Sequence, residues 1–156
     1  EWRYGPEIVQ RLDTSRLKVV RSRRTLRVRG IEADGRPLWV VGNDGQAHPT
    51  FGGADWLLAS APGLVPRVTV HPEAAGFVAS GRSLFSKFVV RADPSLRIEM
   101  TAPLVDPSER LLAVGRLLLA PEEMGRMARG VAVRVTGHAR SPPELEPEPE
   151  PLPRAD

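Results

Sequence analysis

His71–Val90, which reads HPEAAGFVASGRSLFSKFVV, is the stretch that determines the fold of the second half of the chain. Its proline and acid open a short helix over 74–79, and Gly81 stands where a left-handed residue ends a helix. A strand over 84–91 is expected next, because the apolar run continues beyond the glycine. Two cations and two hydroxyls interrupt that run, which is unexpected for a strand that should be buried: Arg82, Ser83, Ser86 and Lys87.

The segments on either side of this stretch predict a small β-rich barrel or sandwich with two short helices. The run 111–119 is nearly all apolar, so we expect it to be a central strand buried on both faces. A second helix is expected over 121–130, because proline and two acids open it and glycine ends it. The other strands are expected over 65–70, 102–106 and 131–135.

The first part of the chain predicts a separate α+β module. Apolar and cationic residues alternate over 17–20 and 26–28, and two Asp-Gly turns flank the strand 37–41, which together indicate a meander of strands. A short helix over 56–59 follows. The small and polar residues 60–63 indicate a junction, so the fold class is α+β with an N-terminal module at 1–63 and a β-rich domain at 64–140.

Composition excludes several classes of function. The 156 residues contain no cysteine, which rules out disulfides, thiolate nucleophiles and zinc sites built on cysteine. No apolar run is long enough to cross a bilayer and no secretory signal is visible, so we expect a cytoplasmic protein without a membrane partner. Phosphate loops, dinucleotide fingerprints, metal motifs and nucleophile elbows are missing, so no catalytic residue, metal or cofactor is predicted.

The charge of the chain is unevenly distributed. Residues 141–156 hold six prolines, five acids and one arginine, and this tail is expected to be disordered. Without the tail the formal net charge rises from +3 to +7, which suits a polyanionic partner. A genome rich in G and C would also favour arginine, whatever the function.

The densest group of cations lies between Arg16 and Arg29, where seven basic residues occur with no acid. Such a run is typical of a phosphate-contacting surface, and we expect a turn that presents Arg21, Arg23 and Arg24 to phosphate. The alternative is the solvated face of a strand, because Arg27 and Arg29 alternate with apolar residues.

The region 68–135 resembles the PUA domain, a small RNA-binding pseudo-barrel. The resemblance is carried by HPEAAGFVASGRSLFSKFVVRADPSLR and, after a gap, by LLAVGRLLLAPEEMGRMARGVAVRV. Together with the segment before it, the text is similar to the carboxyl-terminal region of archaeosine tRNA-guanine transglycosylases, and also to stand-alone archaeal proteins of this build. The large catalytic barrel of those enzymes is missing from this sequence.

The resemblance implies that RNA lies against the first helix of the domain and its flanking strands. The matching positions here are Gly81, Arg82, Ser83 and Lys87. A glycine lets a backbone approach closely, a hydroxyl can donate to phosphate, and cations neutralise it. Arg116 and Arg134 are expected to extend this surface, although strand alternation alone would also turn them to solvent.

The sequence therefore predicts a non-enzymatic RNA-binding protein that recognises tRNA or rRNA by shape and phosphate contacts. It would assist RNA modification or ribosome function, with a separate RNA-modifying enzyme as a possible partner. The alternative is a protein-interaction subunit of a tRNA-modifying enzyme complex, on which the basic surface is incidental. Trp39 and Trp56 are expected in the core, and no set of exposed aromatic residues for stacking bases is predicted.

Overall fold

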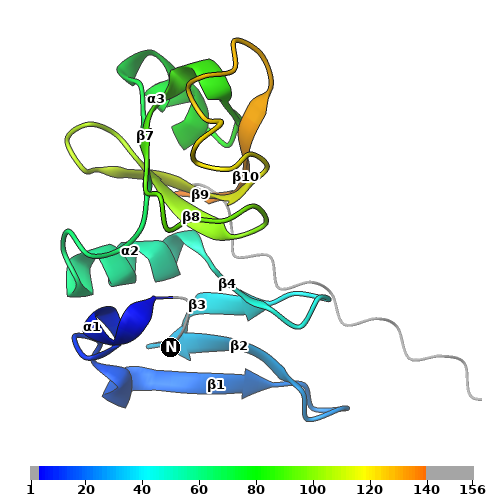
Figure 1. Cartoon of the computed structure of the whole chain (residues 1–156). Helices are drawn as coiled ribbons and strands as arrows, with labels where there is room; N and C mark the ends of the chain where they lie inside the picture. The colour runs from blue at the N-terminus through cyan, green and yellow to red at the C-terminus, as the bar shows by residue number, and fades with distance from the viewer. Residues whose placement is uncertain (1–3, 140–156) are drawn as a thin grey trace, which may run out of the picture.

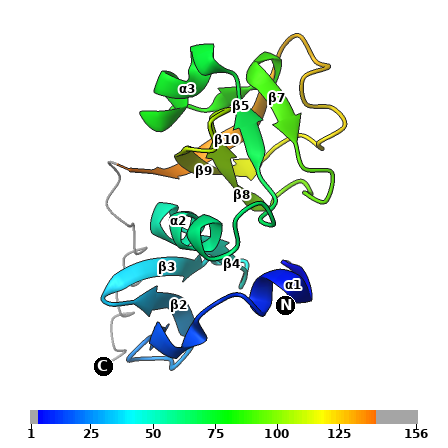
Figure 2. The same cartoon turned by 90° about the vertical axis from the view of Figure 1, so that its left-hand side faces the viewer.

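The computed structural model describes residues 4–139, and the tail that was expected to be disordered lies outside them. The described chain forms two sheets with three α-helices, which confirms the α+β class. In both views helix α2 (Phe51–Ser60) lies between the two sheets (Figures 1 and 2). No helix among the described residues is long and apolar enough to cross a membrane.

Sheet A is the predicted antiparallel meander, in the order β1-β2-β3-β4. Its strands are β1 (Leu17–Arg21), β2 (Val28–Ala33), β3 (Arg36–Val41) and β4 (Ala47–Pro49). Helix α1 (Gly5–Val9) and a 3-10 turn, η1 (Thr14–Arg16), precede it. Leu26 was expected in a strand but lies in the β1–β2 turn with φ +59°, because Ser22 and Arg27 close that turn by a backbone hydrogen bond.

Helix α2 packs so closely against sheet A that its backbone contacts the backbone of β3. Its N-cap Thr50 accepts a hydrogen bond from Gly53 N at 3.0 Å and donates to Pro37 O at 2.7 Å. A Cβ on Gly53 would lie 1.9 Å from Leu38 O, so only glycine allows the helix this close to β3. Trp39 is buried, and its ring meets that of Trp56 edge to face at 5.8 Å, as expected for core residues.

Sheet B forms the near-barrel of the second half, in the order β6-β10-β9-β8-β5-β7. The strands, in chain order, are β5 (Val68–Val70), β6 (Leu84–Phe85), β7 (Val89–Ala92), β8 (Thr101–Val105), β9 (Leu111–Leu117) and β10 (Val131–His138). Every residue of β8 is buried, and β9 is buried over most of its length. This confirms the central strand expected over 111–119, although it ends at Leu117 and residues 118–119 are bends. Helix α3 (Pro72–Ala79) covers this sheet through Ala74 and Val78.

The expected strand over 84–91 is broken in two by a 3-10 turn, η2 (Ser86–Phe88). Ser86 is fully buried, its N–H donates to Gly130 O at 2.9 Å, and its hydroxyl accepts from Gly125 N at 3.1 Å. This serine therefore holds the 121–130 segment in place, and it is not available to a ligand.

The helix expected over 121–130 does not form, and residues 121–126 are a series of turns. The Glu123 carboxylate accepts from Ala120 N at 2.9 Å, so the helix-start signal is real, but Gly125 adopts φ +79° one turn later. Burial of Met124 against the core and the bonds to Ser86 favour turns over a helix.

Candidate RNA-binding surface

The end of α3 is built by a complete helix-terminating motif. Arg82 N donates to Phe77 O and Gly81 N donates to Val78 O, both at 3.0 Å, while Gly81 has φ +98°. This pair of bonds with a left-handed residue between them is a Schellman motif. At the start of the helix, the His71 side chain accepts from Glu73 N at 3.2 Å. Both ends of α3 are thus fixed by local bonds, and Arg82 has a defined starting point.

Gly81 has a second reason to be glycine. The imidazole of His138, at the end of β10, lies against it so closely that a Cβ would come within 2.7 Å of Nε2. The Nδ1 atom of the same ring is buried without a hydrogen-bond partner among the described residues. The close approach at Gly81 is therefore made by a protein side chain, and approach of an RNA backbone there stays a prediction.

The two cations of this segment lie over aromatic rings. The Arg82 guanidinium is 5.4 Å from the centroid of Phe77, and Lys87 Nζ is 4.9 Å from the centroid of Phe88. These contacts orient both charges, and neither cation pairs with an acid within residues 4–139. Ser83, between them, is partly exposed. We call the residues Phe77, Gly81, Arg82, Ser83, Phe85 and Lys87 the α3 surface.

Two members of the α3 surface were missed from the sequence, where no exposed aromatic set was expected. Phe77 is 56% exposed and Phe85 is 50% exposed. The signal was present: Ala74 and Val78 form the buried stripe of α3, which turns Phe77 outward, and Leu84 and Ser86 are buried on either side of Phe85. Exposed rings beside cations are suited to stacking unpaired bases.

Arg116 and Arg134 lie on β9 and β10 of sheet B, and β10 pairs with β6. They are direct neighbours across β9 and β10, and Arg116 also faces Thr101 of β8, whose hydroxyl lies 3.1 Å from Nδ1 of His48 in β4. Arg116 pairs with Glu99 at 3.6 Å. Among the described residues, no hydrogen bond, ion pair or ring contact joins these arginines to the α3 surface, so their membership in it stays a prediction.

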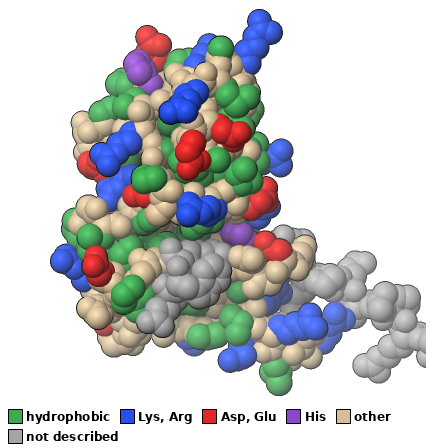
Figure 3. Space-filling model, viewed as in Figure 1, with side chains coloured by type: hydrophobic (Ala, Val, Ile, Leu, Met, Phe, Trp, Pro, Cys, Tyr) green, Lys and Arg blue, Asp and Glu red, His purple; other side chains and the backbone are tan. Residues whose placement is uncertain are grey.

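The β1–β2 turn presents the other predicted cations. Arg23, Arg24 and Arg27 are exposed, and Arg21 Nη1 donates to Leu26 O at 3.1 Å across the turn. Arg16, at the start of the run, pairs with Asp34. Figure 3 shows basic side chains gathered at the lower right, where this turn lies in Figure 1. Phosphate contact by Arg21, Arg23 and Arg24 stays a prediction.

Two carboxyl groups, those of Asp13 and Asp44, have a pKa below the usual range. The backbone N–H of Gln46 donates to Asp44, and this bond lowers the pKa of the Asp44 carboxyl, with a smaller contribution from His48. A side-chain bond from Ser15 likewise lowers the pKa of Asp13. Within residues 4–139, no three His, Asp or Glu side chains are grouped to hold a metal ion.

The fold is that of a small β pseudo-barrel with a capping helix, joined to an α+β module. Its surface at the end of the capping helix is basic and aromatic. Residues 66–139 match the PUA domain family, so this part of the chain is a PUA domain, as its motifs indicated. PUA domains are RNA-binding modules associated with RNA modification.

Archaeal relatives match most of the chain. A tRNA-guanine(15) transglycosylase of Methanocaldococcus jannaschii is 34% identical over 88% of this chain, and that of Thermoplasma acidophilum is 33% identical over 72%. The chain spans only about a fifth of the length of these relatives, 21% and 18% respectively.

Solved structures share the fold. A hypothetical protein of Pyrococcus horikoshii superposes with a TM-score of 0.70 over 90% of this chain and 85% of its own, at 23% identity. A PUA domain protein of Thermoplasma acidophilum gives a TM-score of 0.58 over 72% of this chain and 70% of its own, at 22% identity.

Proposed function

We propose that this chain binds structured RNA, tRNA in the first place and rRNA in the second, and holds it for a separate RNA-modifying enzyme or ribosomal factor. The observation that carries the proposal is the α3 surface: Arg82 and Lys87 lie over aromatic rings on a PUA domain, with neither charge paired to an acid among residues 4–139. Guanidinium and ammonium groups bind phosphate, while the exposed rings accept bases.

The proposal assigns the chain no catalytic step of its own. Its curated relatives are transglycosylases, but the chain corresponds to about a fifth of their length and includes a PUA domain, which is an RNA-binding module. We further propose that the units divide at residues 63 and 64, with the PUA domain extending to about residue 140, since the connection after α2 leads directly into β5.

The test is tRNA binding by the full chain at two salt concentrations. Arg82→Ala combined with Lys87→Ala is expected to weaken binding about tenfold or more and to reduce the slope of log K against log salt by about 2. Arg11→Ala combined with Arg36→Ala removes the same charge from exposed positions on the N-terminal module and serves as the matched control. Equal loss in both double variants would contradict a site on the α3 surface.

A second candidate is suggested by apolar side chains on the β1–β2 hairpin. Val19, Leu26 and Val28 are exposed there, with Leu26 70% exposed at the turn. They favour a protein-interaction subunit of a tRNA-modifying enzyme complex. A salt-insensitive complex with such an enzyme, lost in Leu26→Ser and formed by a chain without measurable tRNA affinity, would support this candidate over RNA binding.

A further inference from the structure

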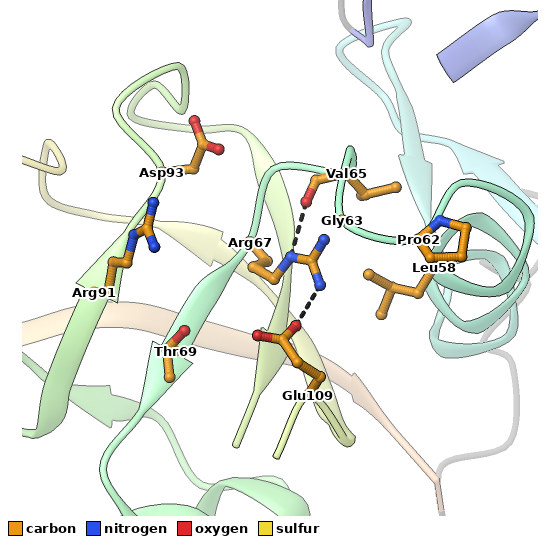
Figure 4. A pocket seen from close by; sticks show the side chains of 9 residues that line it. All are labelled: Leu58, Pro62, Gly63, Val65, Arg67, Thr69, Arg91, Asp93 and Glu109. Atoms are coloured by element: carbon orange, nitrogen blue, oxygen red, sulfur yellow. Dashed lines mark hydrogen bonds and ion pairs between the residues drawn. The ribbon is translucent and has the colours of Figure 1, made fainter. Parts of the chain in front are cut away.

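A cavity of about 380 Å³ opens between the two units of the chain, on the side of the PUA domain away from α3 (Figure 4). One wall is apolar and comes from the end of α2 and the connection after it: Leu58, Pro62 and Val65. The opposite wall is polar and comes from β5 and β7. Volumes of about 300 to 1,000 Å³ with apolar walls and a few convergent polar groups are typical of small-molecule sites.

Three polar side chains on or next to β5 and β7 line this cavity. Thr69 of β5 and Arg91 of β7 are direct partners across the two strands, so their side chains share one face of the sheet. Arg67 lies two residues before Thr69 and lines the same cavity, whereas Val68 and Val70 alternate into the core. Two guanidinium groups and a hydroxyl therefore line the cavity on the outer face of β5 and β7 (Figure 4).

The three side chains differ in how they are engaged. Arg67 is only 17% exposed, donates from Nε to Val65 O at 3.0 Å, and pairs with Glu109 at the cavity rim. Within the described part of the chain, the Arg91 guanidinium and the Thr69 hydroxyl make no hydrogen bond or ion pair. Arg67 is thus a fixed element of the wall, while Arg91 and Thr69 are free to bind.

Neither acid that lines the cavity pairs with Arg91 among the described residues. Asp93 lines the cavity two residues after it, but its Oδ1 accepts from Ser95 N at 2.9 Å and from Ser95 Oγ at 2.6 Å. Glu109 is held by Arg67. The two arginines and two carboxylates sum to zero charge, so a bare multivalent anion gains little, whereas a ligand with both an anionic group and hydrogen-bond donors meets complementary groups throughout.

We propose that this cavity binds a nucleoside monophosphate unit. Its phosphate lies against the Arg91 guanidinium and the Thr69 hydroxyl, with Arg67 at the edge. The base lies along Leu58, Pro62 and Val65, and the free carboxylate oxygens of Asp93 and Glu109 accept from ribose hydroxyls or from N–H groups of the base. The unit is either a free nucleotide or a terminal nucleotide of an RNA.

The first experiment uses the full chain and follows backbone amide resonances while each ribonucleoside 5′-monophosphate is added. At least one is expected to saturate shifts at β5 and β7, and Arg91→Ala weakens its binding about tenfold or more, with Thr69→Val about two- to tenfold. The matched nucleoside without phosphate, inorganic phosphate alone and the exposed control variant Arg36→Ala define the baseline. The variant spectra show whether each protein remains folded.

The second experiment separates the two sources of the nucleotide. A short RNA with a 5′-phosphate, or the same RNA without it, is added to the protein saturated with nucleotide. If only the RNA with the phosphate displaces the nucleotide, the cavity binds an RNA end. If neither RNA displaces the nucleotide, the cavity binds the free nucleotide. No saturation by any nucleotide or RNA, equal binding by inorganic phosphate, or unchanged affinity in Arg91→Ala would overturn the proposal. The Arg82→Ala, Lys87→Ala variant should bind the nucleotide as the wild type does, because both substitutions lie outside the cavity. This control keeps the cavity test separate from the test of tRNA binding on the α3 surface.

Discussion

The α3 surface and the β1–β2 turn both present arginine, but the structure supports them in different ways. At the α3 surface, a Schellman motif, the Gly81–His138 contact and the buried Ser86 fix the backbone, and each cation lies over a ring. At the β1–β2 turn, Arg23 and Arg24 extend into solvent beside the exposed Leu26. The first arrangement favours a defined ligand geometry, because little side-chain freedom is lost on binding, and the second favours non-specific attraction.

The largest effect is expected from Gly81→Ala. The left-handed backbone costs an alanine about 1–3 kcal/mol, and the contact with His138 adds overpacking of about 1–3 kcal/mol. We expect the free energy of unfolding, measured with urea, to fall by about 2–6 kcal/mol. Adding His138→Ala relieves the contact and restores part of the loss. A Gly81→Ala protein as stable as the wild type would show that this backbone is not constrained.

A smaller effect is expected at the β1–β2 turn. Arg23→Ala combined with Arg24→Ala removes the same charge as the α3-surface double variant, and unfolding stability stays within about 0.5 kcal/mol of wild type because both side chains are exposed. tRNA affinity, measured by fluorescence anisotropy, is expected to fall only a few-fold, with the loss disappearing in high salt. A loss larger than that of Arg82→Ala, Lys87→Ala would reverse the ranking of the two regions.

The smallest effect concerns pH. The Gln46 N–H bond lowers the folded-state pKa of Asp44, so its stabilising contribution is fully present above the unfolded pKa of about 3.9 and is lost as pH falls through the folded pKa. Thermal unfolding of wild type and Asp44→Asn should therefore differ by a constant amount above about pH 5 and converge below about pH 4. A difference that grows on acidification would contradict the bond from Gln46.

The sequence predicted those helix ends and turns that depend on hydrogen bonds between neighbouring residues. Pro72 and Gly81 set the ends of α3, and the Asp-Gly turns set the meander, because each signal acts within a few residues. The break at η2 and the missing helix over 121–130 depend on each other through Ser86 and Gly125, which are 39 residues apart, so no local pattern contained them. Whether Arg116 and Arg134 extend the α3 surface stays a prediction, although strand register places them side by side on β9 and β10.

Helix α2 packs on β3 through Gly53 and also contacts β8 and β9, while the His48–Thr101 contact joins β4 to β8. Both sheets therefore pack against one helix, and they are not connected only by a flexible linker. That packing sets the distance from the β1–β2 turn to the end of α3. Under the proposed function, an RNA that contacts both regions must therefore present phosphates at that fixed spacing, and a more compact RNA can engage only one region at a time.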